Sequence, residues 1–144
     1  MDGTAVEILL AEDNPGDVAL TRRALRDSKL RNNLHVVTDG EDALAFLKRE
    51  GTHADAPRPD LVLLDINMPK KTGLEVLAEI KGEPELGMIP VCILTTSEDD
   101  RDILSAYAHH ANAFVTKPLD LAQFAEVVRK IEDFWFTIVK LPKV

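Results

Sequence analysis

Short apolar runs alternate along the chain with longer segments that are apolar along one side. The short runs predict five strands, at Val6–Ala11, Leu34–Thr38, Leu61–Leu64, Val91–Leu94 and Ala113–Val115. The longer segments predict five helices, at Val18–Leu30, Asp42–Arg49, Gly73–Lys81, Glu98–His109 and Leu119–Phe136. Strands and helices that alternate at this spacing predict an α/β protein with a doubly wound parallel sheet, helices on both faces and right-handed crossovers.

Local signals indicate where several of these elements begin and end. Asn14 can cap a helix and Pro15 is tolerated at the first helical position, so the first helix is predicted to start there. Ser97 is predicted to cap the fourth helix, whose first turn is acidic. The polar segment Gly51–Pro59 contains both Gly and Pro and is predicted to be a loop.

Composition narrows the class of protein. The 144 residues fit one domain, and 25 acidic against 17 basic residues give a formal net charge of −8. Hydrophobic residues make up 45% of the chain, enough for a core, while the acidic excess argues against direct nucleic-acid binding. Cys92 is the only cysteine, which excludes an intrachain disulfide, and it is predicted to be a buried core thiol. No secretion signal or bilayer-length apolar run is present, so we expect a cytoplasmic protein without a membrane contact.

Acidic and polar side chains stand where four of the predicted strands end. Glu12 and Asp13 follow the first strand, Asp65 the third, Thr95 the fourth and Lys117 the fifth. If the first and third strands are neighbours, three carboxylates converge, which is unfavourable unless a cation or a proton neutralises them. Mg²⁺ prefers such oxygen ligands, and a hydroxyl with an ammonium can hold phosphoryl oxygens. The pattern therefore predicts an aspartate that accepts a phosphoryl group.

Four motifs in order, AEDNPGD, LVLLDINMP, ILTTS and FVTKP, resemble the receiver domain of two-component response regulators. The resemblance covers about residues 6–135 and implies the flavodoxin-like (βα)5 receiver fold with strand order 2-1-3-4-5. It implies a single receiver domain over 1–144, with a short tail at 136–144 and no output domain. DINMPKKTGLEVLAEIK together with ILTTS is most similar to stand-alone regulators associated with bacterial phytochromes.

The resemblance implies a role for each residue of the acidic group. Asp65 matches the aspartate that is phosphorylated, and Asp13 the carboxylate that binds Mg²⁺ directly. Glu12 matches the carboxylate that acts largely through metal-bound water, and the backbone carbonyl of Asn67 matches the third protein ligand. Asn67 and Ser97 also resemble positions that tune the lifetime of the phosphoryl group.

The same resemblance implies a switch on the other side of the acceptor. Lys117 matches the lysine that pairs with a phosphoryl oxygen, and the bond from Lys117 to Pro118 the one that is usually cis. Thr95 matches the hydroxyl that moves to the phosphoryl group, and Phe114 takes the aromatic switch position. Because Phe114 replaces the Tyr of other members, a partner contact that needs the hydroxyl is lost.

The implied function is phosphoryl transfer from a sensor histidine kinase, a phytochrome among the candidates, to Asp65. The protein is then a phosphoacceptor rather than an enzyme, promoting only its own phosphorylation and dephosphorylation. Its signal leaves by protein–protein contact or by onward transfer to a relay or target protein. We also hypothesise a homodimer through the fourth helix, fifth strand and fifth helix. The tail is expected to contribute because Phe134, Trp135 and Phe136 cannot all face one core.

Three other functions share the strand–helix alternation. A flavodoxin-type redox protein needs a neutral phosphate-binding loop after its first strand, whereas AEDNPGD is acidic. A dehalogenase-type phosphatase usually has a second Asp where this chain has Asn67. A degenerate receiver that acts as a scaffold without phosphorylation is expected to lose Asp65, Lys117 or a metal acid, and all are present. The phosphorylatable receiver ranks first, the scaffold second and the phosphatase third.

Overall fold

A single parallel sheet forms the centre of the molecule. The computed structural model describes residues 5–27, 31–96, 99–117 and 121–134. Five strands pair in the order β2-β1-β3-β4-β5, all parallel. Their bounds are β1 Val6–Ala11, β2 Asn32–Val37, β3 Leu61–Leu64, β4 Val91–Thr95 and β5 Ala113–Thr116. The predicted fold class and strand order are therefore confirmed, and β1 lies beside β3.

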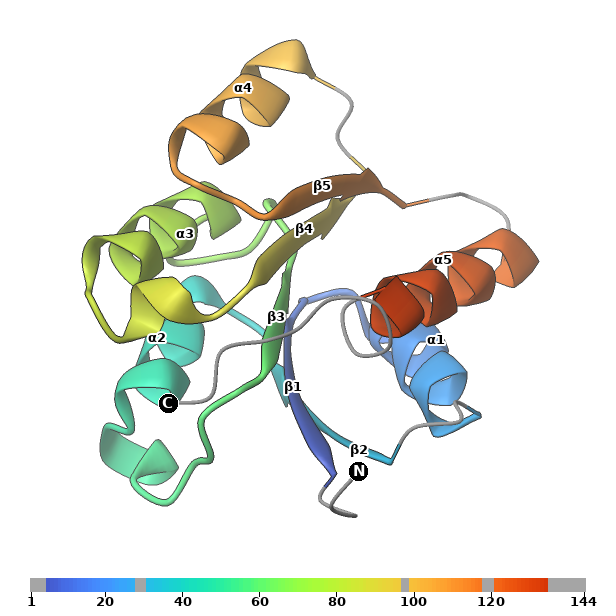
Figure 1. Cartoon of the computed structure of the whole chain (residues 1–144), viewed down its shortest axis with the longest axis horizontal. Helices are drawn as coiled ribbons and strands as arrows, with labels where there is room; N and C mark the ends of the chain where they lie inside the picture. Colours follow the sequence, from blue (N-terminus) through green and yellow to red (C-terminus); the bar gives the residue numbers. More distant parts are fainter. Residues whose placement is uncertain (1–4, 28–30, 97–98, 118–120, 135–144) are drawn as a thin grey trace.

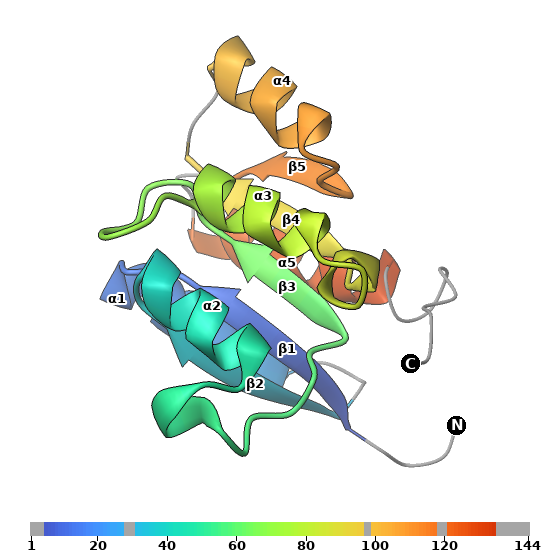
Figure 2. The ribbon, with the colours of Figure 1, turned by 90° about the vertical axis from the view of Figure 1, so that its left-hand side faces the viewer.

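Five helices cover the two faces of the sheet (Figure 1). Their bounds are α1 Pro15–Arg26, α2 Gly40–Lys48, α3 Gly73–Gly82, α4 Asp100–Ala108 and α5 Leu121–Asp133. Figure 2 shows α2 and α3 side by side in front of the sheet, with α4 beyond them next to β5. Helices α1 and α5 pack together on the opposite face. Within the described residues, no helix is long and apolar enough to cross a membrane.

Two apolar clusters, one on each face, hold these layers together. All four residues of β3 are buried, as expected for a central strand covered on both sides. Leu77 and Ile80 of α3 belong to the cluster on one face, and Phe124 and Val128 of α5 to the cluster on the other. Cys92 is fully buried, as predicted, and burial raises the pKa of its thiol to about 12.

Several element ends differ from the prediction, because polar side chains set them. Strand β2 begins at Asn32, two residues early: it pairs with Val6, and its side-chain amide donates to the Leu25 carbonyl at 2.9 Å. Helix α2 begins at Gly40 because the Asp39 side chain accepts the Asp42 N–H at 2.7 Å.

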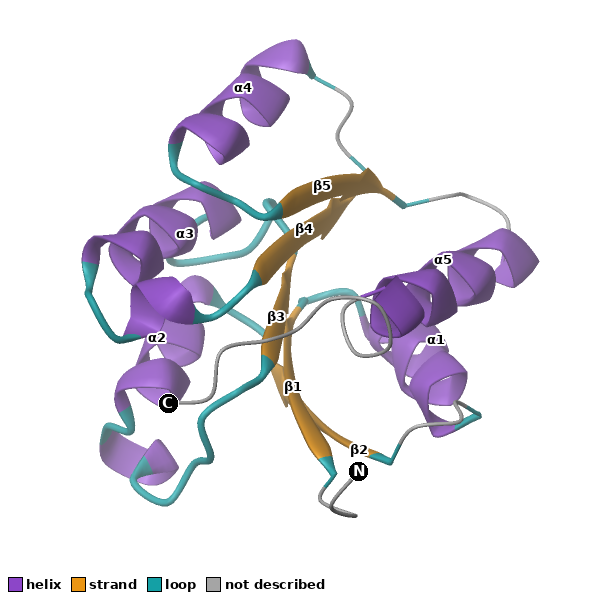
Figure 3. Ribbon diagram, viewed as in Figure 1, coloured by secondary structure: helices purple, strands orange, loops and turns teal. Residues whose placement is uncertain are grey.

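The fourth helix starts later than the prediction. Its cap is Asp99, whose side chain accepts the Arg101 N–H at 2.8 Å, so α4 begins at Asp100. Ser97, the predicted cap, lies outside the described residues, as do 28–30, 119–120 and 135–136 at the predicted helix ends. The predicted loop at Gly51–Pro59 contains one short 3-10 helix, η1, at Gly51–His53, and a second, η2, spans Leu86–Met88. Figure 3 colours helices purple and loops teal, so the helices can be told from the loops that connect them.

Candidate functional site

Side chains from four strand ends meet at the carboxyl edge of the sheet, where the backbone ladder continues beyond the strands. The Glu12 N–H donates to the Val37 carbonyl at 2.9 Å, and the Asp65 N–H donates to the Ala11 carbonyl at 3.0 Å. The Lys117 N–H donates to the Thr95 carbonyl at 2.7 Å. These bonds hold Glu12, Asp65 and Lys117 against the sheet, so their side chains project from a rigid base.

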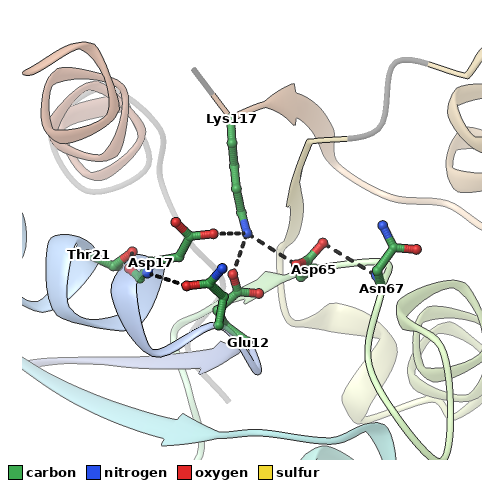
Figure 4. A network of polar contacts seen from close by, with 7 residues as sticks. Glu12, Asp17, Thr21, Asp65, Asn67 and Lys117 are labelled. Carbon is green, nitrogen blue, oxygen red and sulfur yellow. Dashed lines mark hydrogen bonds and ion pairs between the residues drawn. The ribbon is translucent and has the colours of Figure 1, made fainter. Parts of the chain in front are cut away.

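The ammonium of Lys117 lies at the centre of this group. Its Nζ donates to Oε1 of Glu12, to Oδ2 of Asp17 at 2.9 Å and to Oδ2 of Asp65 at 3.1 Å (Figure 4). Glu12, Asp65 and Lys117 are all buried, and Asp17 is half-buried. A single cation therefore joins acidic side chains that follow β1 and β3 and one from the first turn of α1.

This crowding divides the acids into one that keeps its proton and one that loses it. Burial, together with a hydrogen bond to Asp65, raises the pKa of Glu12 to about 9. Burial also opposes ionisation of Asp65, but hydrogen bonds with Glu12 and Thr95 and the charge of Lys117 together lower its pKa. Asp65 is therefore a carboxylate at neutral pH, the form that can act as a nucleophile.

The lysine remains charged although it is buried. Burial alone disfavours the ammonium of Lys117, but its hydrogen bonds to Glu12 and Asp17 and the charge of Asp65 outweigh that effect and raise its pKa. Three acceptors match the three N–H donors of an ammonium group. The site thus keeps a fixed positive charge next to the ionised Asp65.

Three carboxylates form a group that fits a divalent cation. Glu12, Asp13 and Asp65 each offer an oxygen, and these atoms lie within 4.8 Å of one another. Oε2 of Glu12 is buried and receives no hydrogen bond within the described part of the chain. Oxygen ligands with excess negative charge suit a hard cation such as Mg²⁺. The donor set therefore fits the predicted metal, and the assignment of its ligands remains a prediction.

The loop after β3 places Asp65 through a close backbone approach. A Cβ at Gly73 would lie 2.1 Å from the Asp65 carbonyl oxygen, so only glycine fits where α3 starts. The Gly73 N–H donates to the Ile66 carbonyl at 2.8 Å. A capping box between Thr72 and Glu75 then fixes the first turn of α3. Asn67, in this loop, is exposed and donates its N–H to Oδ1 of Asp65 at 3.4 Å.

The two predicted switch residues lie on the strands beyond Asp65. Thr95 is fully buried and its hydrogen bond with Asp65 is among the causes that lower the pKa of that group. Phe114 is half-buried against the cluster beneath α3 and α4. Its N–H donates to the hydroxyl of Tyr107 on α4 at 3.2 Å, which links β5 to that helix. The bond from Lys117 to Pro118 and the residue Ser97 are outside the described residues.

Asp17 is the contact of Lys117 that the sequence analysis missed. It stands in the quoted motif AEDNPGD, yet no role was predicted for it. An acid in the first turn of a helix is ordinarily explained by the helix dipole. That explanation gives no reason to expect a contact with a residue far away in the sequence. The order of the elements could have predicted this contact. Helix α1 begins directly after β1, so its first turn lies at the same carboxyl edge of the sheet as the other acids.

Comparisons with known proteins agree with this geometry. Residues 8–129 match the family described as the response regulator receiver domain. Response regulator Rcp1 of Synechocystis sp. is 44% identical over 135 residues, which are 94% of this chain and 92% of that protein. The crystal structure of the phosphorylated cyanobacterial phytochrome response regulator RcpA is 45% identical with a TM-score of 0.95, covering 97% of this chain and 100% of that one. The Mn²⁺-bound form of Rcp1 is 43% identical with a TM-score of 0.92, covering 96% and 99%.

Proposed function

This chain belongs to the response regulator receiver domain family, and we propose that it accepts a phosphoryl group from a sensor histidine kinase on Asp65. The observation that carries the proposal is the contact of an ionised, buried Asp65 with the Lys117 ammonium, 3.1 Å away, beside two further acids. A carboxylate held between a positive charge and a cation-binding group is placed to attack phosphorus.

The chemistry assigned to each side chain follows from these contacts. An Oδ atom of Asp65 forms the new bond to phosphorus while the bond to the kinase imidazole breaks. Lys117 is placed to donate to a phosphoryl oxygen, because its ammonium already contacts Asp65. The Thr95 hydroxyl, whose hydrogen bond with Asp65 helps to lower the pKa of that carboxyl, is placed to contact the new phosphoryl group.

Mg²⁺ is the proposed cofactor. Asp13, Asp65 and the Asn67 carbonyl would hold it directly, and Glu12 through water. When bound, the cation neutralises charge on the phosphoryl oxygens. Support comes from the acid group itself and from the similar regulator Rcp1, whose crystal structure is that of a Mn²⁺-bound form. The proton on Glu12 must leave if that side chain is to serve the metal as a carboxylate.

A phytochrome is the proposed kind of kinase, and α4, β5 and α5 the proposed output face. The kinase assignment rests on the similarity to solved phytochrome and bacteriophytochrome response regulators.

The proposed output face carries exposed apolar side chains. On α4, Leu104 and Tyr107 are 71% and 50% exposed and stand one turn apart, while Phe134 at the end of α5 is 49% exposed. Exposed large apolar side chains are typical of a contact surface, and a second copy of the chain is the proposed partner.

Sedimentation velocity tests the dimer. Leu104→Glu is expected to give monomers at concentrations where the wild type is dimeric. Met88→Glu changes an equally apolar residue, 48% exposed on η2, and is expected to leave the dimer intact. A chain ending at Asp133 lacks Phe134, Trp135 and the tail, and of these residues only Phe134 is described. An unchanged dimer in that truncation removes the tail from the interface.

A phosphate-affinity gel after treatment with acetyl phosphate and Mg²⁺ tests the acceptor. The wild type is expected to shift, and the shifted band should disappear with hydroxylamine, which cleaves acyl phosphates. Asp65→Asn is expected not to shift, whereas Asp55→Asn, a change of an exposed aspartate, should shift like the wild type. A wild type that never shifts would favour the scaffold function, and a shift in Asp65→Asn would assign another acceptor.

A further inference from the structure

Asp17 differs from the other two carboxylates that contact Lys117. Glu12 and Asp65 belong to the group of three acids that fits a cation, whereas Asp17 lies outside that group. Its side chain is 25% exposed, compared with 2% for Glu12 and 10% for Asp65. Its Oδ2 lies 2.9 Å from the Lys117 Nζ, a shorter distance than the 3.1 Å to Asp65.

Asp17 is also held firmly by its own helix. It is the third helical residue of α1, and its N–H donates to the Asn14 side chain at 3.1 Å. Its carbonyl accepts the Thr21 hydroxyl at 2.8 Å, and Figure 4 shows Thr21 beside Asp17 on the same helix. The carboxylate therefore projects from a fixed turn toward the carboxyl edge of the sheet.

Phosphoryl transfer changes two of the three acceptors of Lys117. If Glu12 serves a cation and Asp65 becomes an acyl phosphate, the cation and the phosphoryl group compete with the ammonium for these two carboxylates. Lysine has four rotatable stem bonds, so without another anchor its ammonium loses orientation. Asp17 neither binds the cation nor becomes phosphorylated in this scheme, so it can keep one N–H of the Lys117 ammonium fixed throughout the reaction.

We propose that Asp17 is a positioning residue that anchors Lys117 while Glu12 and Asp65 change partners, an inference that rests on the proposed function. One N–H remains on Asp17 and the other two stay directed at the acceptor side, where phosphoryl oxygens replace a carboxylate oxygen. Asp17 shares a hydrogen bond with Glu12 but is not one of the three acids of the cation group, and it acts through the lysine.

Two substitutions separate positioning from charge. Asp17→Asn keeps an acceptor oxygen at nearly the same place, and Asp17→Ala removes it. With saturating acetyl phosphate and Mg²⁺, Asp17→Ala is expected to phosphorylate about tenfold more slowly, and Asp17→Asn within about threefold of the wild type. The matched control is Asp42→Ala, because Asp42 is the third residue of α2 and its N–H is likewise capped by a side chain, but its carboxylate contacts His53. This control is expected to react at the wild-type rate.

A second measurement does not depend on phosphorylation. With Mg²⁺ present and no phosphodonor, the NMR order parameter of the Lys117 side chain is expected to fall in Asp17→Ala and to be restored in Asp17→Asn. If both variants transfer faster than the wild type, Asp17 repels the phosphodonor and the proposal is wrong. Wild-type order of Lys117 in Asp17→Ala also overturns it. If the wild type itself is not phosphorylated, the proposed function fails, and the order parameter still decides about Asp17.

Discussion

Two lysines hold the opposite ends of the same sheet, and they are surrounded by different kinds of oxygen. At the carboxyl edge, Lys117 donates to three acidic side chains. At the amino edge, Lys81 in the last turn of α3 donates to the carbonyls of Gly87 at 3.0 Å and Ile89 at 2.8 Å, and to Oδ1 of Asn112 at 3.1 Å. Both ammonium groups use three acceptors, so the difference between the sites lies in charge.

Because of this difference in charge, the site around Lys117 can accept a cation or a phosphoryl group, whereas the three described acceptors of Lys81 carry no excess negative charge to bind one. Burial lowers the pKa of Lys81, because its neutral acceptors do not compensate for lost water. At the other end, acidic acceptors raise the pKa of Lys117 although burial opposes it. The neutral site ties η2 and the entries of β4 and β5 to α3. The acidic site holds excess negative charge that a cation or phosphoryl group can redistribute.

The largest expected difference between the two lysines is in phosphorylation. Lys117→Met is expected to slow transfer from acetyl phosphate about 100-fold or more, because one fixed charge at the reacting group is lost. Lys81→Met should remain within about threefold of the wild type, because its ammonium lies at the amino edge. Phosphate-affinity gels with a time course measure both rates. Equal losses in the two variants would contradict the division into a chemical and a structural site.

The second difference concerns stability and its response to Mg²⁺. Without metal, Lys117→Met leaves buried acids without their cation and is expected to lower the free energy of unfolding by about 3–5 kcal/mol. Added Mg²⁺ should recover much of this loss. Lys81→Met is expected to cost about 1–3 kcal/mol, since three hydrogen bonds are lost, and Mg²⁺ should not restore it.

Urea unfolding with either EDTA or Mg²⁺ measures both variants under matched conditions. The comparison fails if Mg²⁺ rescues Lys81→Met as well, because general salt effects then explain the recovery. It also fails if Lys117→Met remains insensitive to Mg²⁺, because the acids would then not form a cation site.

The two sites also differ in how well the sequence predicts them. Asp65 and Lys117 could be predicted because side chains that follow parallel strands meet at one edge. The Lys81 site could not, because two of its three acceptors are backbone carbonyls, which every residue type carries. Asp17 received no predicted role, and a first-turn acid gives little reason to expect one, since the helix dipole alone accounts for an acid at that position.

The ends of helices and strands also differ in how well the sequence predicts them. Strand β3 is apolar along its whole length, and its bounds were predicted correctly. The start of α4 was not, because Asp99 competes with Ser97 as a cap and only the fold selects between neighbouring polar residues. Burial of apolar runs is therefore easier to predict than hydrogen bonds between polar side chains.

A third prediction concerns the pH dependence of the acidic site in EDTA. The pKa of Glu12 is raised from 4.5 to about 9 by burial and by its hydrogen bond to Asp65, so the folded protein holds a proton that the unfolded chain releases. This contribution is full below pH 4.5 and is lost as pH rises through about 9. Glu12→Gln cannot titrate, so the wild type should lose more free energy of unfolding between pH 5 and 9, by a few kcal/mol on the order expected for such shifts. Parallel pH profiles would show that Glu12 is not protonated in the fold.

The smallest effect is expected when the amino-edge site is given one acid. Asn112→Asp keeps an oxygen for Lys81 and for the Val91 N–H, which Oδ1 of Asn112 accepts at 2.9 Å, and adds a charge. Because Asn112 is exposed, the free energy of unfolding at pH 7 should change by less than about 1 kcal/mol.

The sign of this change in the free energy of unfolding follows from the contact between the new carboxylate and Lys81. The new carboxylate beside Lys81 should have a lowered pKa, so any stability it adds is present at neutral pH and is lost as pH falls through that pKa. Urea unfolding at pH 7 and pH 3, with and without Mg²⁺, measures it. One carboxylate and one ammonium cancel, so Mg²⁺ should have no effect. A Mg²⁺ response in Asn112→Asp would mean that a single acid beside a lysine suffices, and that the acid excess around Lys117 is not what makes the carboxyl edge a cation site.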